Sequence, residues 1–304
     1  MNENKIAVIV PVHNRKECTL NCLRQLHNVD ASGRELDVVI VDDGSSDGTS
    51  EAVREKFQSV IVLRGDGNLW WTGAINKGIE YALDRNYKGV LFLNDDLELD
   101  KKFLCELFSV VEENPGALVS SLKLRRTSGG DAEIITAGFD ISGYLMRIVN
   151  RRQGEIYDEI SIPEVETCDA LTGAALYVPC QVISDIGLLD FNKFPHNWGD
   201  IEFTRRASLK GYKCLVATRS HIFTEDNPNY HRTYFIESSK GEYIRNMFDS
   251  HKFSYGFLFT MRSSFMHKPI LVGVVCCMIG ILRNIKNLTL KILVPNKVLR
   301  KFSS

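Results

Sequence analysis

Apolar and polar positions form two recurring patterns in the first 120 residues. Short, nearly continuous apolar runs alternate with longer stretches in which apolar residues return every three or four positions. The first pattern predicts buried strands and the second predicts crossover helices, the arrangement of a parallel sheet. The predicted strands are 5–10 (ended by Pro11), 36–41, 60–63, 89–93 and 117–120, and the predicted helices are 15–26, 74–83, 100–113 and one that starts near Thr49 and is capped by Ser46 or Asp47. The chain therefore begins as an α/β fold.

Polar side chains follow three of these predicted strands. His13 and Asn14 follow the first strand, Asp42 and Asp43 the second, and the triplet 94–96 the fourth. In an open α/β sheet, ligands bind at the carboxyl ends of the strands. Carboxylates repel a diphosphate unless a divalent cation lies between them, and Mg²⁺ and Mn²⁺ prefer oxygen ligands. Each motif alone is also explained as a turn or a helix cap, but their combination favours a metal-assisted diphosphate site.

Residues 122–165 are polar and irregular, with loops around short predicted strands near 133–139 and 144–149. We expect this segment on the acceptor side of the molecule. No repeat or low-complexity linker interrupts the chain, which predicts one continuous catalytic domain.

Composition narrows the partners and the compartment. The chain has 304 residues, 44% of them hydrophobic, and its 37 basic and 38 acidic side chains nearly cancel. This balance argues against nucleic acid as a partner. The eight cysteines lack paired CxxC spacing, which predicts reduced thiols in a cytoplasmic protein. The N-terminal run MNENKIAVIVPV is interpreted as a first strand rather than a signal peptide.

The end of the chain combines apolar and cationic residues. The run 269–282 has 14 apolar positions, fewer than the ~20 of a membrane-spanning helix. The cations that follow it are Arg283, Lys286, Lys291, Lys297, Arg300 and Lys301. This pattern suits a helix lying on the anionic inner face of the plasma membrane, and a packing helix with a solvated basic end is the alternative.

The motifs in this order resemble the family 2 glycosyltransferases, which have a GT-A fold. The matching stretches are IAVIVPVHNR, VVIVDDGSSDGT, GNLWWTGAINKGI, VLFLNDDLEL, LTGAALYV and WGDIEFTRRASLKGY. GNLWWTGAINKGI followed by NDD is most similar to the branch of bacterial rhamnosyltransferase-like O-antigen and capsule polysaccharide transferases. The resemblance implies a Rossmann-like, mostly parallel sheet flanked by helices in a catalytic domain over 1–250, with a nucleotide-sugar half (1–120), an acceptor half (121–250) and a helical tail (251–304).

The resemblance also implies an activity. We expect an inverting, metal-dependent transferase that moves a sugar from a dTDP- or UDP-sugar to a hydroxyl of a glycan or lipid-linked glycan acceptor. Rhamnose, galactose and N-acetylhexosamine donors all stay open, as do the linkage and the oligomeric state.

The donor-side residues follow from the same resemblance. The positions expected to line the nucleoside pocket are Pro11, His13, Asp42 and Asp43, and the positions expected beside the donor are Gly73 and Asn76. Asn94, Asp95 and Asp96 occupy the D-x-D position, with Asn94 in place of the first carboxylate. Asp96 is therefore the expected ligand of Mn²⁺ or Mg²⁺, and Asp95 is expected to meet the ribose or the donor sugar.

The acceptor side centres on Asp200. The motif WGDIE resembles the family's acidic motif, with Gly199 where an acidic residue is usual and Asp200 as the expected catalytic base. The alternative is that Asp200 only caps the helix that follows. His221 is the expected third metal ligand, and His231 competes for that role. The loop 172–174 resembles one near the donor sugar and the acceptor.

Two other functions fit parts of this pattern. A nucleotidyltransferase also combines an α/β nucleotide fold with acidic metal ligands, but it usually has a glycine-rich loop after the first strand, and VPVHNRKE has no glycine. A non-catalytic nucleotide-sugar-binding relative is disfavoured because both Asp96 and Asp200 are present.

Overall fold

The computed structural model describes residues 5–225, 230–248 and 256–294. Contacts divide the chain into two units. Unit 1 comprises Met1–Asp140 and Ile148–Glu225, and unit 2 comprises Ile141–Arg147 and Asp226–Ser304. The division after Glu225 falls inside the segment 1–250 that the sequence assigns to one domain.

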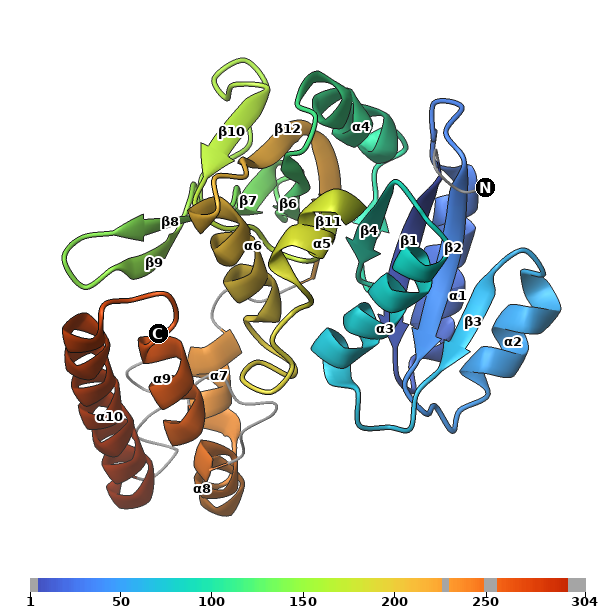
Figure 1. Cartoon of the computed structure of the whole chain (residues 1–304). Coiled ribbons are helices and arrows are strands. Elements are labelled where there is room, and N and C mark those ends of the chain that lie inside the picture. The colour runs from blue at the N-terminus through green and yellow to red at the C-terminus, as the bar shows by residue number, and fades with distance from the viewer. Residues whose placement is uncertain (1–4, 226–229, 249–255, 295–304) are drawn as a thin grey trace. The chain divides into compact units, whose positions relative to one another are not determined.

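Unit 1 is built on a mixed sheet in which the strand order along the main path is β10-β12-β6-β11-β4-β1-β2-β3 (Figure 1). The strands are β1 (Ile6–Val12), β2 (Leu36–Asp42), β3 (Ile61–Arg64), β4 (Gly89–Leu93), β5 (Glu98–Leu99), β6 (Leu118–Arg126), β7 (Ala132–Thr136), β10 (Val165–Cys168), β11 (Ala175–Pro179) and β12 (Cys214–Phe223). Strands β4, β1, β2 and β3 pair in parallel, and β6 and β12 form a second parallel pair. Strand β11 runs antiparallel between β4 and β6 and joins the two groups.

Helices cover both faces of this sheet. The helices of one face are α3 (Trp70–Asp84), α5 (Cys180–Ile186) and α6 (Gly199–Leu209), and those of the other face are α1 (Lys16–Asn28), α2 (Thr49–Lys56) and α4 (Phe103–Glu113). Side chains of β1 alternate between the two faces: Ala7 and Ile9 pack with α3, whereas Val8 and Val10 pack with α1 and α4. Unit 1 is thus a three-layer α/β structure, as the sequence predicts.

Two predicted boundaries were wrong for physical reasons. Strand β1 does not end at Pro11 but runs to Val12, and because the ladder to β4 stops at Ile9, no strand on that side needs the N–H group that Pro11 lacks. Helix α3 begins at Trp70 rather than near Ala74. The N-cap of α2 is Gly48 (φ 80°) rather than the predicted Ser46 or Asp47. The Asp47 carboxylate, one residue before that cap, accepts hydrogen bonds from the N–H groups of Thr49 (3.1 Å) and Lys16 (2.9 Å), the first residues of α2 and α1.

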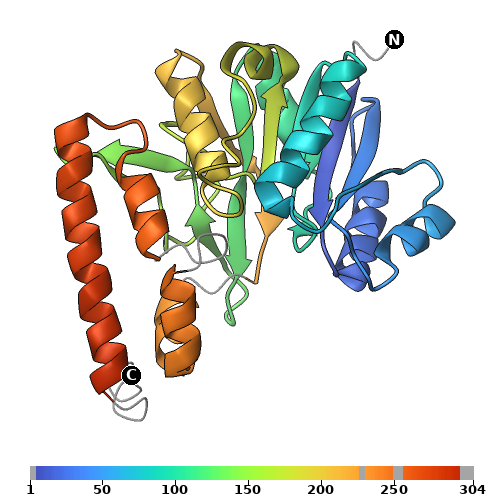
Figure 2. The same ribbon diagram turned by 60° about the horizontal axis from the view of Figure 1, so that its bottom comes forward.

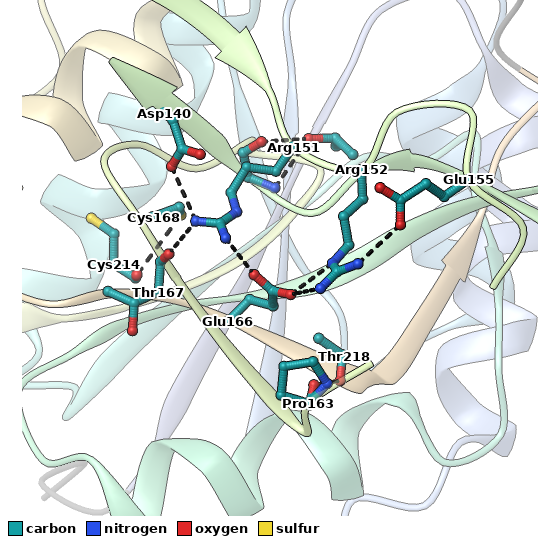
Figure 3. Close-up of polar contacts among 12 residues, drawn as sticks. Asp140, Arg151, Arg152, Glu155, Pro163, Glu166, Thr167, Cys168, Cys214 and Thr218 are labelled. Atoms are coloured by element: carbon teal, nitrogen blue, oxygen red, sulfur yellow. Dashed lines mark hydrogen bonds and ion pairs between the residues drawn. The ribbon is translucent and has the colours of Figure 1, made fainter. Parts of the chain in front are cut away.

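The segment 122–165 is more ordered than its polar composition predicts. Strand β6 continues to Arg126 and pairs with β7, and β8 (Phe139–Ser142) pairs with β9 (Arg147–Asn150). Figure 3 shows the buried carboxylate of Glu166 on β10 between Arg151 and Arg152, at 2.8 Å and 2.6 Å from their guanidinium nitrogens. Arg151 also donates to Asp140 on β8 (3.1 Å). Charge pairs therefore fasten this part of unit 1 to the sheet in addition to buried apolar side chains such as Ile134 and Ile162.

Unit 2 contains the helices α7 (Tyr230–Glu237), α8 (Lys240–Phe248), α9 (Phe257–Ser264) and α10 (Ile270–Leu293). In Figures 1 and 2, α9 lies along one side of the long helix α10. The helix extends beyond the apolar run 269–282: α10 has 24 residues and, by length and composition only, is the one helix among the described residues that is long and apolar enough to cross a membrane. It continues past Leu282 because no helix breaker occurs before Pro295.

Candidate active site

The candidate site lies at the carboxyl edge of the parallel strands. The loops after β1, β2 and β4 all leave the sheet at this edge. Because β11 is antiparallel to β4 and pairs Ala175 with Leu93, the loop before β11 reaches the same edge. The backbone N–H group of Asn94 donates to the carbonyl of Ala174 at 3.0 Å. The motifs NDD and LTG, far apart in sequence, are therefore neighbours.

His13 and Asn14 form a hydrogen-bonded network with the loop after β2. The His13 Nδ1 lies 2.6 Å from the carbonyl oxygen of Asp43, which can only accept, so this nitrogen carries a proton. The Asn14 side-chain nitrogen lies 3.0 Å from His13 Nε2. The Asn14 side-chain oxygen accepts from Ser46 N–H at 2.8 Å. The network fixes the two loops against each other.

Asp42 and Asp43 are both buried, at 3% and 5% exposure, and both bind backbone. One Asp42 oxygen accepts from the Ser45 N–H (2.9 Å) and the other from the Ser50 hydroxyl. Asp43 accepts from three N–H groups, those of Gly67 (2.8 Å), Leu69 (2.9 Å) and Trp70 (3.0 Å). These last bonds explain the early start of α3. Both carboxylates shape the loops around the expected nucleoside pocket, and a direct bond to a base stays a prediction.

The three residues after β4, 94–96, lie in three different environments. Asn94 accepts a hydrogen bond from the Trp71 indole (2.9 Å), Asp95 is 5% exposed, and the Asp96 carboxylate is open to solvent with 44% of its side chain exposed. Asp95 accepts from the Thr19 hydroxyl at 3.0 Å. Burial raises the pKa of Asp95 to about 6, against the opposing effect of nearby Arg15.

Arg15 is a site residue that the sequence analysis did not identify. Its guanidinium lies 3.4 Å from Asp95 and 3.1 Å from Asp96, and so it neutralises part of the acidic cluster. The signal was present in the sequence, because Arg15 follows the first strand and the acidic triplet follows β4, the strand beside it. Only the strand order, which places these two ends side by side, reveals the pairing.

The residues present fit a divalent cation held mainly by one protein carboxylate. Among the described residues, no three His, Cys, Asp or Glu side chains gather as a ready-made ligand set. Mg²⁺-type sites often use one or two carboxylates and complete their shell with water and substrate phosphate oxygens. The exposed Asp96 suits that role, and the neighbouring Asp95 is hydrogen-bonded within the protein.

Asp200 lies beside the same edge through its contact with the loop before β11. Its carboxylate accepts from the Gly173 N–H at 2.6 Å and from the Ile201 N–H at 2.9 Å. A Cβ atom on Gly173 would lie 2.5 Å from the Trp71 ring and 3.0 Å from the Asp200 Cβ. Trp71, Gly173 and Asp200 are therefore in direct contact, and Trp71 connects them to Asn94.

The structure also bears on the helix-cap alternative for Asp200. Helix α6 begins at Gly199, and its N-cap is Trp198 in a left-handed conformation (φ 70°), whose side chain makes no capping hydrogen bond. Asp200 lies inside the first turn and uses one oxygen to hold the Gly173 loop. Burial raises the pKa of Asp200 above its usual value, while Lys123 on β6 and the two N–H donors act against that shift.

Gly199, at the position where the resemblance implies an acidic residue, has little space for a side chain. A Cβ atom at this position would lie 2.4 Å from the Thr72 hydroxyl and 3.2 Å from the Phe194 carbonyl. Thr72 itself donates to that carbonyl at 2.6 Å. The close approach of α3 and α6 thus requires glycine here.

Gly73 and Asn76 lie on α3 against the segment 189–191. The Asn76 amide donates to the Leu189 carbonyl (2.9 Å) and accepts from the Leu189 N–H (3.0 Å). A Cβ atom on Gly73 would meet the Phe191 ring at 3.1 Å. Both residues fix the first turns of α3 against the segment 189–191. Their closeness to a donor stays a prediction.

His221 lies on β12, with its Nε2 3.0 Å from the Thr218 carbonyl oxygen and its ring 4.6 Å from that of Tyr157. Burial lowers the pKa of His221, which favours the neutral imidazole that a metal would need. The structure does not gather it with Asp96 into a three-residue ligand set. The side chain of His231 lies outside the described residues.

Comparison with known proteins gives a consistent picture. The family described as Glycosyl transferase family 2 matches residues 7–160. The low-salt glycan biosynthesis hexosyltransferase Agl10 of Haloferax volcanii is 26% identical over 202 residues, which cover 65% of this chain. The match spans 62% of that relative's length.

Two solved structures share the fold. GalNAc-T7, solved with UDP, GalNAc and Mn²⁺, aligns over 88% of this chain and 52% of its own, with a TM-score of 0.59 and 15% identity. The mannosyltransferase PcManGT of Pyrobaculum calidifontis, solved with GDP-Man and Mn²⁺, aligns over 91% of this chain and 74% of its own, with a TM-score of 0.54 and 14% identity. At this identity the likeness shows a shared GT-A architecture.

Proposed function

Because the chain belongs to glycosyl transferase family 2, we propose that it transfers a sugar, with inversion, from a dTDP- or UDP-sugar to a hydroxyl of a glycan or lipid-linked glycan acceptor. The setting we propose is cell-surface polysaccharide synthesis, at the cytoplasmic side of a membrane. The observation that carries the proposal is the contact chain Asn94, Trp71, Gly173 and Asp200, which brings the acidic loop after β4 and the carboxylate on α6 to one edge.

On this proposal the donor binds at the carboxyl ends of β1, β2 and β4. Asp42 and Asp43 hold the loops that surround the nucleoside, and Asp96 offers the exposed carboxylate for Mn²⁺ or Mg²⁺. The cation, when bound, stabilises the negative charge of the leaving nucleoside diphosphate. Arg15 must exchange its contact with Asp96 for the phosphate oxygens or move aside.

Asp200 is proposed as the general base. Its carboxylate would accept the proton of the acceptor hydroxyl while that oxygen attacks the anomeric carbon from the face opposite the diphosphate. The hydrogen bonds from Gly173 and Ile201 fix the carboxylate plane. The raised pKa of Asp200 makes its ionised carboxylate a stronger base than that of an exposed aspartate.

The test has a binding part and a turnover part. Calorimetry with UDP-, dTDP- and GDP-sugars, with Mn²⁺ and then with a chelator, should show tight binding of one nucleotide class that the chelator abolishes. Asp200→Asn should bind that donor normally while turnover falls about 10²-fold or more. Binding of no donor would refute the nucleotide-sugar site, and near-normal turnover would remove Asp200 as the base.

A further inference from the structure

Helix α10 exposes most of its large apolar residues, whereas its fully buried residues are small or polar. Its buried residues are Gly273, Gly280, Asn284 and Lys291. Its exposed large apolar residues are Ile270, Leu271, Val274, Val275, Met278, Ile279, Leu282, Ile285, Leu290, Ile292 and Leu293. A helix that packs on the core of a water-soluble protein shows the reverse distribution. The outward face of α10 is therefore suited to an apolar environment.

The inward face is already complete. A Cβ atom on Gly273 would lie 2.4 Å from the ring of Phe265, the residue after α9, and one on Gly280 would lie 2.4 Å from Thr260 of α9, so the two segments pack closely at both glycines. The Asn284 amide donates to the Thr260 hydroxyl at 2.8 Å. The Lys291 ammonium donates to the Phe235 carbonyl at 2.5 Å. The polar groups of the two buried polar residues of α10, Asn284 and Lys291, are thus both hydrogen-bonded within unit 2.

The charge of the C-terminal segment indicates what kind of surface the outward face of α10 would bind. The 54 residues after Ser250 contain nine lysines and arginines and no aspartate or glutamate, although the whole chain has 37 basic and 38 acidic residues. Arg283 and Lys286 are exposed on α10 itself. An apolar face within a purely cationic segment complements an anionic phospholipid surface, where each basic residue adds attraction.

The position of the cations favours an in-plane helix. A helix of 24 residues is about 36 Å long, enough to cross a bilayer. Crossing would bring Arg283 and Lys286, which interrupt the apolar face, into hydrocarbon at high cost. If the helix lies parallel to the surface, both long side chains can reach the lipid phosphates while their stems stay among apolar groups.

We propose that the outward face of α10, with the exposed Leu258 and Met261 of α9, inserts into one leaflet of an anionic phospholipid bilayer. Membrane binding is then a property of unit 2 alone and does not rest on the proposed transferase activity. A second copy of this chain is the competing occupant of the same face.

Vesicle flotation of the full chain tests the proposal. Vesicles of phosphatidylcholine with phosphatidylglycerol should carry the chain upward, and Val275→Glu with Met278→Glu should lower that partition about a hundred-fold or more. The matched control replaces two exposed apolar residues of unit 1, Ile160→Glu with Leu209→Glu, and should float like the unchanged chain. Arg283→Gln with Lys286→Gln should weaken binding about thirty-fold on anionic vesicles and far less on pure phosphatidylcholine.

Three outcomes would overturn the proposal. The chain could stay in the aqueous layer with both vesicle types, or the two glutamates could leave flotation unchanged. Sedimentation could instead show a dimer that the Val275→Glu with Met278→Glu variant dissociates and that does not float, which would make a second copy the occupant. Donor calorimetry in vesicle-free buffer is independent of these results, so it separates failure of this proposal from failure of the proposed function.

Discussion

Replacing Gly173 by alanine tests whether the contact among Trp71, Gly173 and Asp200 sets the geometry of the site. The new Cβ would lie 2.5 Å from Trp71 Cη2 and 3.0 Å from the Asp200 Cβ. Carbon atoms pack at about 3.5–4.0 Å, so the ring or Asp200 must move by about 1 Å. A displacement of that size at a reacting group costs about 10²-fold in rate, and the overpacking costs about 1–3 kcal/mol of unfolding free energy.

The assay measures turnover and urea unfolding together. Gly241→Ala is the control, because a Cβ there meets nothing within 4 Å, and both quantities should stay near normal. Trp71→Phe removes the outer indole ring, so the double variant Gly173→Ala with Trp71→Phe should recover part of the stability that Gly173→Ala loses. Strictly additive losses, or full turnover in Gly173→Ala, would refute the proposed contact.

The remaining predictions concern charge. Asp96→Ala should abolish the dependence of donor binding on Mn²⁺ in calorimetry, and unchanged metal dependence would move the ligand elsewhere. The pKa of Asp95, raised to about 6, predicts that the folded chain is stabilised relative to the Asp95→Asn variant. This stabilisation is complete below pH ~4 and is lost as the pH rises through about 6. Urea unfolding of both chains from pH 4.5 to 7.5 measures it, and a constant difference in unfolding free energy would contradict the prediction. Glu166→Gln should lower the unfolding free energy by about 2 kcal/mol, because it removes the charge between two partly buried arginines. Glu98→Gln, which weakens an exposed pair with Arg126, should lower it by under about 1 kcal/mol. Equal shifts in melting temperature for the two variants would argue against a role for burial.

The sequence predicted the local parts of this structure better than the contacts between them. Periodicity and turn residues gave the strand 89–93 as the structure has it, and they placed the polar triplet 94–96 at its end. The extension of β1 through Pro11 depended on which neighbouring strand stops first, and the start of α3 depended on the distant carboxylate of Asp43. Both are tertiary effects that a local pattern does not contain.

The same limit applies to the candidate site. The resemblance selected Asp96 and Asp200, but the pairing of Arg15 with the acidic triplet required the order of β4 and β1 in the sheet. Asn76 illustrates the opposite case. Its amide matched a position expected beside the donor, yet the fold uses both of its polar atoms to hold Leu189. Sequence identifies the polar residues at the edge, and packing decides which of them stay available to a ligand.

The antiparallel strand β11 has a mechanical consequence. Ala175 pairs with Leu93, and Asn94 bonds to Ala174. The loop that holds Asp200 and the acidic loop after β4 therefore leave the sheet from two neighbouring, hydrogen-bonded strands. The span between the two halves of the site is therefore set by strand spacing and not by a hinge. Loops at this edge can therefore change in length and sequence without altering the distance between the strands that carry Asn94 and Ala174.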